Sequence, residues 1–478
     1  MIQKLIGRHA ECEELRQCLS SDQAEFVIVY GRRRIGKTFL IEEFFNQTYA
    51  FKFVGGHRQS NKVQLQNFSK ALQKYSHTKL PAFTDWTEAF DALTECLENI
   101  ETDGKKVVFF DEMPWIDNIH SDFVSALEYF WNSWGASQDD LLFIATGSST
   151  SWMVDKLIEN QGGLHNRITT SIYLSPFTLK ETEEYLRSRH CPWSRYDILQ
   201  CYMLTGGVPY YLKLLNVRNS LAQNIDRLCF TPKGKLRLEF DELYNALFSN
   251  ATSYLAVVKL LSEHKAGLTR NEIIEKSGIE GTKVSRILKN LERSDFIAKR
   301  LQYGNVKRDA IYRLVDFYTL FYYKFLEHND GLDDCWWTTN MSSPSVLAWM
   351  GLTFELICLQ HHKQIKAALG IAGVATSVST WRCPANKDKG LPGAQIDMVM
   401  ERADRIIHLC EMKFSTGTYT LKKDYLDWFQ KRLWLFKEVT GTTKAVVGTF
   451  VTTYGLTNPT YSHLVHSEVT MDDLFNFD

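Results

Sequence analysis

Short apolar runs alternate with longer helical patterns along the first part of the chain. The runs are rich in Val, Ile and Phe, and apolar residues recur at helical spacing between them. This alternation is typical of a parallel sheet covered by helices, whose strands are buried on both faces. The sequence predicts strands at Phe26–Tyr30, Phe51–Val54, Val107–Phe110, Leu141–Ala145 and Ile172–Leu174. It predicts intervening helices that include Thr38–Asn46 and Phe123–Trp134.

The rest of the chain changes character three times. Residues 175–245 are helical throughout and break at Gly206-Gly207-Val208-Pro209. Three helices and a hairpin follow, at Ser253–Glu263, Thr269–Lys276, Glu280–Arg293, Phe296–Leu301 and Ala310–Leu314. The last region holds two helices and two apolar strands, at Leu347–His361, Lys422–Lys437, Gln395–Met400 and Arg405–Met412. We therefore expect an α/β protein with four parts, at residues 1–175, 176–250, 251–330 and 345–478.

Composition excludes some classes of protein. The 478 residues are 44% hydrophobic and 23% charged, with a net charge of -1, so any basic surface must be local. No apolar run approaches the roughly 18–20 residues of a membrane span, so we expect no membrane partner. The N-terminus lacks the apolar stretch of a signal peptide, and the ten cysteines form no C-x-x-C pair. We expect reduced, buried cysteines in a cytoplasmic protein.

A phosphate-binding loop follows the first predicted strand. The motif G-x-x-x-x-G-K-[ST] is matched by Gly31-Arg32-Arg33-Arg34-Ile35-Gly36-Lys37-Thr38, between a strand and a helix. Glycines let backbone N–H groups curl around phosphates, and the helix N-terminus adds positive potential. Lys37 is expected to reach the β- and γ-phosphates, and the Thr38 hydroxyl to hold Mg²⁺.

Further polar groups follow the next strands. Asp111 and Glu112 end the third strand, where Asp111 is expected to hold Mg²⁺ and Glu112 to polarise the attacking water. The cluster after the fourth strand includes Ser148, which is either a sensor of the γ-phosphate or part of an ordinary polar loop. Arg167 precedes the last strand and either neutralises transition-state charge or is a solvated or salt-bridged residue.

These motifs together resemble the archaeal-type ATPases, a branch of the STAND/AAA+-like P-loop NTPases. The resemblance covers about residues 1–245, with the phosphate loop, Asp111-Glu112-Met113-Pro114-Trp115, Gly147-Ser148-Ser149 and Gly206-Gly207-Val208-Pro209-Tyr210-Tyr211 in the family's order. It implies ATP as the nucleotide and a helical lid whose turn, with Pro209, senses it. It also implies that Leu5-Ile6-Gly7-Arg8 and Glu13 lie near the adenine. The stretch Leu164-His165-Asn166-Arg167 departs from the family's aromatic-Gly-Arg, which weakens the case for Arg167.

The segment from Ser253 to Arg313 is basic, with 13 lysine and arginine residues against seven acidic ones. Its predicted helices and hairpin resemble a winged helix-turn-helix. In that fold the third helix offers polar side chains to a major groove and the wing meets phosphates. The residues concerned are Thr282, Lys283, Ser285, Arg286 and Lys289 on the helix, and Lys299, Arg300, Lys307 and Arg308 on the wing. The sequence thus indicates double-stranded DNA as a partner; the alternative is a module for protein contacts.

The last region carries acids and a lysine at a suggestive spacing. Asp397 lies on one predicted strand, and Glu411 and Lys413 share a face of the next. With Glu355 on the preceding helix, the pattern resembles the PD-(D/E)xK nuclease core. The resemblance implies Mg²⁺ on Glu355, Asp397 and Glu411, with Lys413 stabilising charge. The alternative is a hairpin with surface charges, and we expect the adjacent His361 and His362 to be a solvated pair.

We therefore expect an ATP-hydrolysing protein that uses ATP and Mg²⁺ and couples nucleotide state to DNA engagement. Two alternatives remain open. One is a metal-dependent DNA nuclease regulated by ATP. The other is a nucleotide-dependent switch or scaffold with negligible turnover, which forms homo-oligomers when nucleotide binds.

Overall fold

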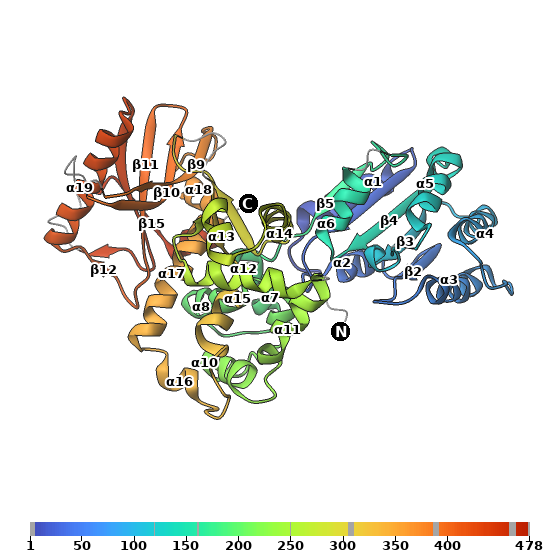
Figure 1. Cartoon of the computed structure of the whole chain (residues 1–478), viewed down its shortest axis with the longest axis horizontal. Coiled ribbons are helices and arrows are strands. Elements are labelled where there is room, and N and C mark those ends of the chain that lie inside the picture. Colours follow the sequence, from blue (N-terminus) through green and yellow to red (C-terminus); the bar gives the residue numbers. More distant parts are fainter. Residues whose placement is uncertain are drawn as a thin grey trace. The chain divides into compact units, whose positions relative to one another are not determined.

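The computed structural model describes residues 5–118, 120–159, 162–248, 250–304, 310–385, 392–457 and 465–476. Its contacts divide the chain into two compact units, Met1–Pro176 and Phe177–Asp478 (Figure 1). Within the described ranges, no helix combines the length and apolar character that a membrane crossing requires.

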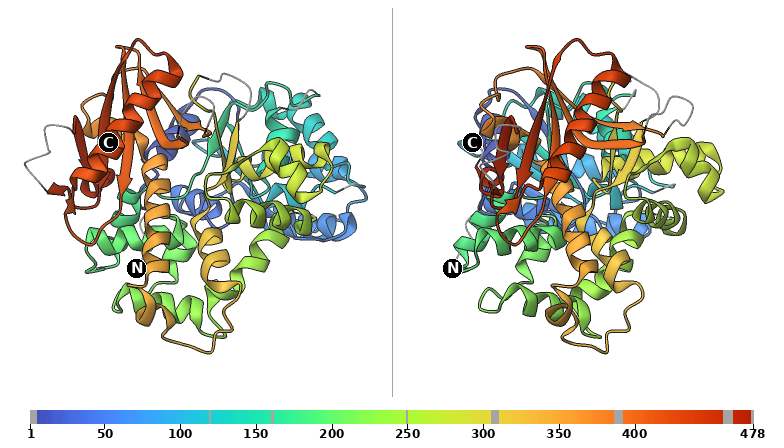
Figure 2. Two further views of the ribbon diagram at one scale, coloured as in Figure 1. Left: turned by 60° about the vertical axis from the view of Figure 1, so that its left-hand side comes forward. Right: turned by 90° about the vertical axis from the view of Figure 1, so that its left-hand side faces the viewer.

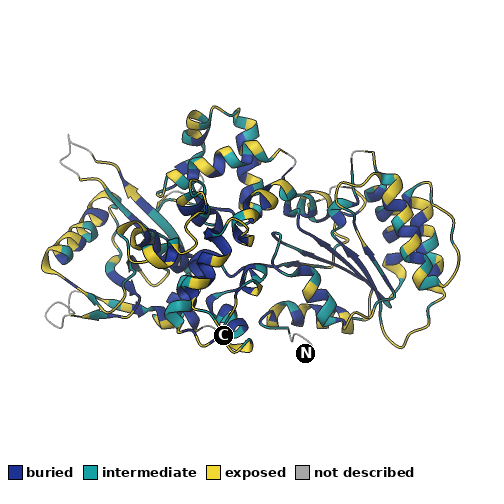
Figure 3. Ribbon diagram, turned by 90° about the horizontal axis from the view of Figure 1, so that it is seen from below, coloured by how far each residue is buried: buried dark blue, intermediate teal, exposed yellow. Residues whose placement is uncertain are grey.

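The first unit is built on a five-stranded parallel sheet. Its strand order is β2-β3-β4-β1-β5, and all neighbouring pairs are parallel. The strands are β1 (Glu25–Tyr30), β2 (Phe51–Val54), β3 (Lys106–Asp111), β4 (Leu141–Gly147) and β5 (Thr170–Tyr173). All five predicted strands are therefore confirmed. The central strands β1, β3 and β4 are dark in Figure 3 because they are buried on both faces, as their apolar sequences require, whereas the edge strands β2 and β5 also carry exposed residues.

Helices cover this sheet on both faces. They are α1 (His9–Ser20), α2 (Lys37–Phe44), α3 (Asn61–Ser76), α4 (Trp86–Glu98), α5 (Phe123–Ser133) and α6 (Thr150–Met153). One core contains Phe26, Phe110 and Phe143 with the apolar faces of α3, α4 and α5. The opposite core contains Val27, Phe109 and Ile144 with residues of α1 and α2. Alternate residues of one strand thus enter opposite cores, which fixes the layers of the unit.

The second unit begins with a helical region. Its helices are α7 (Leu179–Ser188), α8 (Arg195–Thr205), α9 (Pro209–Lys213), α10 (Leu221–Ile225) and α11 (Lys235–Leu247). Thr178 and Ser194 begin α7 and α8 with reciprocal capping boxes. The uniformly helical character of residues 175–245 is confirmed.

Three helices and a small sheet follow. The elements are α12 (Ala251–Glu263), β6 (Leu268–Thr269), α13 (Arg270–Ser277), α14 (Gly281–Arg293), β7 (Ile297–Arg300) and β8 (Ile311–Leu314). The strands form an antiparallel sheet in the order β6-β8-β7. Val284, Ile287 and Leu291 bury one face of α14, so the helical spacing of apolar residues correctly predicts the packing. We refer to α12–α14 as the three-helix segment and to β7 and β8 as the hairpin.

The remaining helices are α15 (Phe317–Phe321), α16 (Trp336–Asn340), α17 (Pro344–Gln360), α18 (His362–Ala368) and α19 (Lys423–Thr440). A second five-stranded sheet has the order β15-β13-β11-β10-β9, antiparallel from β9 to β11 and parallel beyond. Its strands are β9 (Thr376–Cys383), β10 (Ala394–Arg402), β11 (Ile406–Lys413), β13 (Ala445–Thr452) and β15 (Ser467–Thr470). A separate parallel pair is β12 (Tyr419–Thr420) with β14 (Leu456–Thr457). Helix α17 packs beside β11 (Figure 2).

The hairpin is joined to this second sheet within the same unit. Beyond β7, Gln302 pairs with Thr380 of β9, and the Tyr303 N–H donates to the Thr380 carbonyl at 2.7 Å. The Tyr303 ring lies 4.9 Å from that of Phe436 on α19. The chain that follows β7 of the hairpin and the C-terminal sheet therefore share backbone pairing as well as side-chain contacts.

Candidate functional site

The phosphate loop connects β1 to α2. Gly36 precedes α2 with φ 89°, a conformation that favours glycine. A Cβ on Gly31 would lie 2.3 Å from the carbonyl oxygen of Leu174, so only glycine lets the loop pass this close to the end of β5. The motif thus requires glycine at its two positions for different reasons, the positive φ of Gly36 and the close approach of Gly31 to Leu174. The loop residues between them, Arg32, Arg33, Arg34 and Ile35, lie at the carboxyl edge of the sheet.

Lys37 lies against the loop that precedes it. Its Nζ donates to the carbonyls of Gly31 at 3.1 Å and Arg32 at 3.0 Å, and the side chain is buried. Burial lowers the Lys37 pKa, while the charges of Glu112 and Asp111 oppose that shift. An amine in this position is ready to exchange carbonyl partners for phosphate oxygens, which are better matched to its charge.

Thr38, Asp111 and Thr146 form one hydrogen-bonded group. The Thr38 hydroxyl lies 2.9 and 3.0 Å from the two carboxylate oxygens of Asp111, and the Thr146 hydroxyl donates to the same carboxylate. Burial raises the Asp111 pKa, and the bond from Thr146 counteracts it. The structure thus brings together two residues that were each predicted to hold Mg²⁺. A hydroxyl and a carboxylate side by side form a donor set that suits Mg²⁺.

Glu112 is held beside this group. One of its carboxylate oxygens accepts the Ser148 N–H at 3.1 Å and the Ser148 hydroxyl at 2.7 Å. The Glu112 N–H donates to the Thr146 hydroxyl at 3.2 Å, with the backbone at φ 50°. The ends of β1, β3 and β4 thus bring together Lys37, Thr38, Asp111, Glu112 and Ser148.

Residues 5–215 match a family of ATPase domains found predominantly in Archaea. The match starts in the first unit and ends just after α9. Together with the geometry above, it supports nucleotide binding and ATP hydrolysis by this region.

Two further proteins are similar to the chain. An uncharacterized protein of Methanocaldococcus jannaschii is 25% identical over 330 residues, which cover 68% of this chain and 69% of that protein. A Walker-type ATPase of Pyrococcus abyssi has a similar structure, with a TM-score of 0.50 and 17% identity. That likeness covers 68% of this chain and 97% of the other, and at this identity it shows the fold alone.

Arg167 is not brought to the phosphate loop of the ATPase domain. Thr169 and Thr170 pair with Phe26 and Val27 of β1, so Arg167 precedes the amino end of the sheet. The phosphate loop follows the carboxyl end of β1, which is the opposite edge. Arg167 is exposed, and a role at the phosphates would require a second molecule.

The N-terminal residues assigned to the adenine fall into two groups. Arg8 is buried and donates to the Ser175 carbonyl at 2.7 Å. Glu13 pairs with Arg16 on the surface at 2.9 Å. Arg8 therefore anchors the end of the first unit, and Glu13 belongs to a solvated helix face.

Pro209 lies at the start of α9 in the second unit. The turn before it has Gly206 at φ 56° and Gly207 at φ 69°. The Phe177 N–H donates to the Gly207 carbonyl at 2.9 Å, and a Cβ on Gly207 would meet the Phe177 carbonyl at 2.1 Å. The turn is thus fastened to the first residue after the boundary between the units. The role of Pro209 in nucleotide sensing stays a prediction.

The C-terminal acids are only partly brought together. Met398 pairs with Cys410, so Asp397 and Glu411 occupy neighbouring positions on β10 and β11. Glu411 pairs with Lys413 at 2.8 Å and accepts the Tyr425 hydroxyl of α19. Across the described ranges, no three acidic, histidine or cysteine side chains converge as metal ligands. The expected trio with Glu355 is therefore not assembled in this conformation.

Arg313 of β8 contacts two of these acids and accounts for the absence of a metal-ligand trio in this conformation. Its guanidinium lies 3.3 Å from an Asp397 carboxylate oxygen and 3.5 Å from one of Glu355. Burial and the charge of Asp397 raise the Glu355 pKa to about 7, against the effect of Arg313. The sequence did not associate Arg313 with these acids, because 84 residues separate it from Asp397.

Helix α19 supplies two more groups that the sequence analysis missed. Tyr425 binds Glu411, and the Lys413 ammonium lies 4.9 Å from the centre of the Tyr425 ring. Arg432 donates to the Gln395 carbonyl at 2.8 Å, and the Gln395 amide donates to Asp397 at 3.0 Å. For these two groups, the sequence analysis went no further than predicting a helix after the strand that carries Glu411 and Lys413.

The predicted DNA-facing residues differ in exposure. Thr282, Ser285, Arg286 and Lys289 are exposed on α14, and Lys283 is half-buried. On the hairpin, Lys299 is exposed, but Arg300 is half-buried, and burial with the Arg313 charge lowers its pKa. That Arg300 meets phosphates stays a prediction. Lys307 and Arg308 lie outside the described residues.

His361 corrects another expectation. It is buried, and its Nε2 accepts the Leu179 N–H at 3.1 Å while Nδ1 lies 2.9 Å from the Ile357 carbonyl. Burial lowers its pKa to about 4. It is therefore a neutral connection between α17 and α7, and His362 beside it is half-buried.

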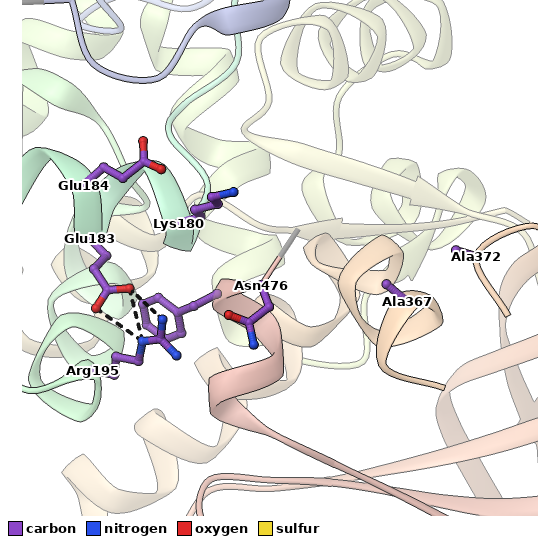
Figure 4. A pocket seen from close by; sticks show the side chains of 8 residues that line it. Lys180, Glu183, Glu184, Arg195, Ala367, Ala372 and Asn476 are labelled. Carbon is purple, nitrogen blue, oxygen red and sulfur yellow. Dashed lines mark hydrogen bonds and ion pairs between the residues drawn. The ribbon is translucent and has the colours of Figure 1, made fainter. Parts of the chain in front are cut away.

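A hollow of about 620 Å³ lies elsewhere in the second unit (Figure 4). Arg195 and Glu183 on its wall bind each other at 3.1–3.2 Å, and Arg195 also pairs with Asp472 at 3.3 Å. Because these opposite charges pair with one another, Arg195 has no uncompensated charge with which to bind a phosphate group in this hollow.

Proposed function

We propose that this protein binds Mg²⁺–ATP at the phosphate loop and hydrolyses it, and that nucleotide state controls engagement of double-stranded DNA. The observation that carries the proposal is the contact of Thr38 with Asp111, with Glu112 next in the chain. It supports a metal-binding pair and a base at the same edge of the sheet as Lys37.

The residues of the chain have distinct roles in this proposal. Lys37 exchanges its loop carbonyls for phosphate oxygens, and Thr38 and Asp111 hold the cation. Bound Mg²⁺ supplies charge stabilisation for the transferred phosphoryl group. Glu112 polarises the attacking water, with Ser148 fixing the direction of its carboxylate.

DNA engagement is assigned to the three-helix segment, which has the order of elements of a winged helix-turn-helix. The polar, exposed face of α14 supports this proposal, since a recognition helix presents polar side chains to a major groove. Arg286 and Lys289 are the charged groups on that face. A protein partner in place of DNA is the outcome if duplexes do not bind.

The second candidate function is metal-dependent cleavage of phosphodiesters by the C-terminal sheet, which has the PD-(D/E)xK pattern. The proximity of Glu411 and Lys413, at 2.8 Å, favours it. Asp397 and Glu355 complete the acidic set, but the described conformation does not present them as a ligand trio.

Phosphate release by the purified chain tests the first function. Lys37→Ala should abolish nucleotide binding and release, whereas Lys62→Ala, on the exposed face of α3, should leave both unchanged. Equal release by wild type and Lys37→Ala would refute the assignment. Tight ATP binding with negligible turnover would instead favour a nucleotide-dependent switch.

A further inference from the structure

Arg313 lies where a cation bound to Glu355 and Asp397 would have to lie. We propose that Arg313 is an internal cation that closes the C-terminal site, and that a divalent cation binds these acids only after the hairpin withdraws it. The inference rests on the metal-dependent function proposed for this site.

One guanidinium faces both carboxylates at the site. Glu355 and Asp397 belong to different elements, and the Arg313 guanidinium offers a separate nitrogen to each, at 3.5 and 3.3 Å. Arg313 is only 9% exposed. Buried charges without partners are strongly unfavourable, so the arginine and the acids stabilise each other.

A second cation cannot be added to this arrangement. A divalent ion bound to the same two carboxylates would lie within a few ångströms of the guanidinium, where like charges repel strongly. Solvent can reach the acids, because Glu355 and Asp397 line a hollow of about 350 Å³ with Lys265 and Gln395. Competition with Arg313, rather than access, therefore limits cation binding.

The position of Arg313 is set by the hairpin. Arg313 pairs with Ala298 of β7, and the chain beyond β7 continues onto β9 through Gln302 and Thr380. The Tyr303 hydroxyl also donates to Glu401 of β10 at 3.2 Å. A shift of the hairpin along β9 would move Arg313 relative to Asp397, so the hairpin and the acidic site are mechanically connected.

Mn²⁺ binding to the full-length chain, followed by electron paramagnetic resonance, tests the proposal. All variants carry Asp111→Asn, which removes the cation ligand at the phosphate loop. Arg313→Met should bind Mn²⁺ about tenfold or more tightly than its parent, because a closed conformer reduces apparent affinity by the open fraction. Arg218→Met, at an exposed arginine of the same unit to which no binding role is assigned, should match the parent. Adding Asp397→Asn to Arg313→Met should remove the gain.

A second pair of substitutions leaves Arg313 in place. Gln302→Cys with Thr380→Cys joins directly paired positions, whose spacing suits a disulfide. The oxidised form should bind Mn²⁺ no more tightly than the parent in any condition compared. Reduction of the disulfide should restore whatever gain in Mn²⁺ affinity the movement of the hairpin allows. If the oxidised form binds Mn²⁺ tightly through Asp397, the hairpin does not control the site.

The possible outcomes distinguish a failure of the proposed closure by Arg313 from a failure of the metal-dependent function on which it rests. If the parent and Arg313→Met bind Mn²⁺ equally well, and Asp397→Asn abolishes binding in both, the proposed closure of the site by Arg313 is refuted and the metal site stands. If binding survives Asp397→Asn, the proposed metal-dependent function of these acids is refuted. If neither protein binds Mn²⁺, the proposed closure by Arg313 is also refuted, because it requires a gain in Mn²⁺ affinity when Arg313 is replaced.

Discussion

Ser148 donates both its backbone N–H and its hydroxyl to one carboxylate oxygen of Glu112, at 3.1 and 2.7 Å. The bonds join the ends of β3 and β4, next to the pair formed by Thr38 and Asp111. A serine hydroxyl has one hydrogen, so it cannot donate to Glu112 and to a γ-phosphate at once. If Ser148 senses the γ-phosphate, it must release part of its hold on Glu112.

Ser148→Ala should lower kcat for ATP hydrolysis by roughly tenfold or more, since one hydrogen bond to a charged group contributes about 1.5 kcal/mol or more. ATP affinity should change little, because the backbone N–H still restrains Glu112. Ser149→Ala, one residue further, is the matched control. Steady-state kinetics and equilibrium nucleotide binding check this, and an unchanged kcat would show that Ser148 does not position Glu112.

Gly207→Ala should destabilise the second unit far more than Gly278→Ala. Both glycines have positive φ, at 69° and 66°, so both alanines incur a backbone cost of about 1–2 kcal/mol. Only Gly207 adds a collision, with the Phe177 carbonyl, whereas a Cβ on Gly278 meets nothing within 4 Å. Urea unfolding should show an additional loss of about 1–3 kcal/mol for Gly207→Ala. Equal losses would mean that the turn relaxes away from Phe177.

His361 should contribute a loss of stability to the second unit as the pH is lowered from 6.5 towards 4. His361 has its pKa lowered from 6.5 to about 4 in the folded state, so the unfolded chain binds more protons between these values. This contribution should reach about 3 kcal/mol and should be absent in His361→Gln, so the difference between the two pH profiles isolates it from Glu355 and His408, which titrate in both proteins. His328→Gln, whose side chain is 84% exposed, should retain the wild-type pH profile. A His361→Gln profile as steep as that of the wild type contradicts the assignment.

Arg286→Ala and Lys289→Ala should each weaken binding of a duplex and reduce the dependence of log K on log salt by about one. The reason is that each exposed side chain of α14 is expected to neutralise one phosphate. Fluorescence anisotropy at several salt concentrations measures both effects. Glu275→Ala on α13 controls for the loss of a charged side chain. Salt slopes unaffected by either substitution would direct attention to a protein partner.

The sequence predicted the ATPase region well because its signals are local. Each buried parallel strand is a short run of Val, Ile and Phe, and the phosphate loop needs its residues within one turn of chain. Asp111 and Glu112 could be assigned because the carboxyl ends of parallel strands meet at one edge. Arg167 could not be placed, since its distance from the loop depends on the register of β5 with β1.

The C-terminal region was predicted less completely because its contacts are distant in sequence. Strands β9 and β13 escaped prediction, and Thr376–Cys383 has few continuous apolar residues. Arg313 and Tyr425 reach the acids only through the folding of the hairpin and α19. His361 was expected in a solvated pair because adjacent residues point to different faces of a helix, yet it accepts a bond from the N–H of Leu179, 182 residues earlier.

The central claim is that Glu112 polarises the water that attacks bound ATP. The most direct test is single-turnover phosphate release with Glu112→Gln, together with ATP binding by the same protein. The account predicts ATP affinity close to that of the wild type and release slower by about 10²–10⁴. Release within twofold of the wild-type rate, with binding intact, would contradict it.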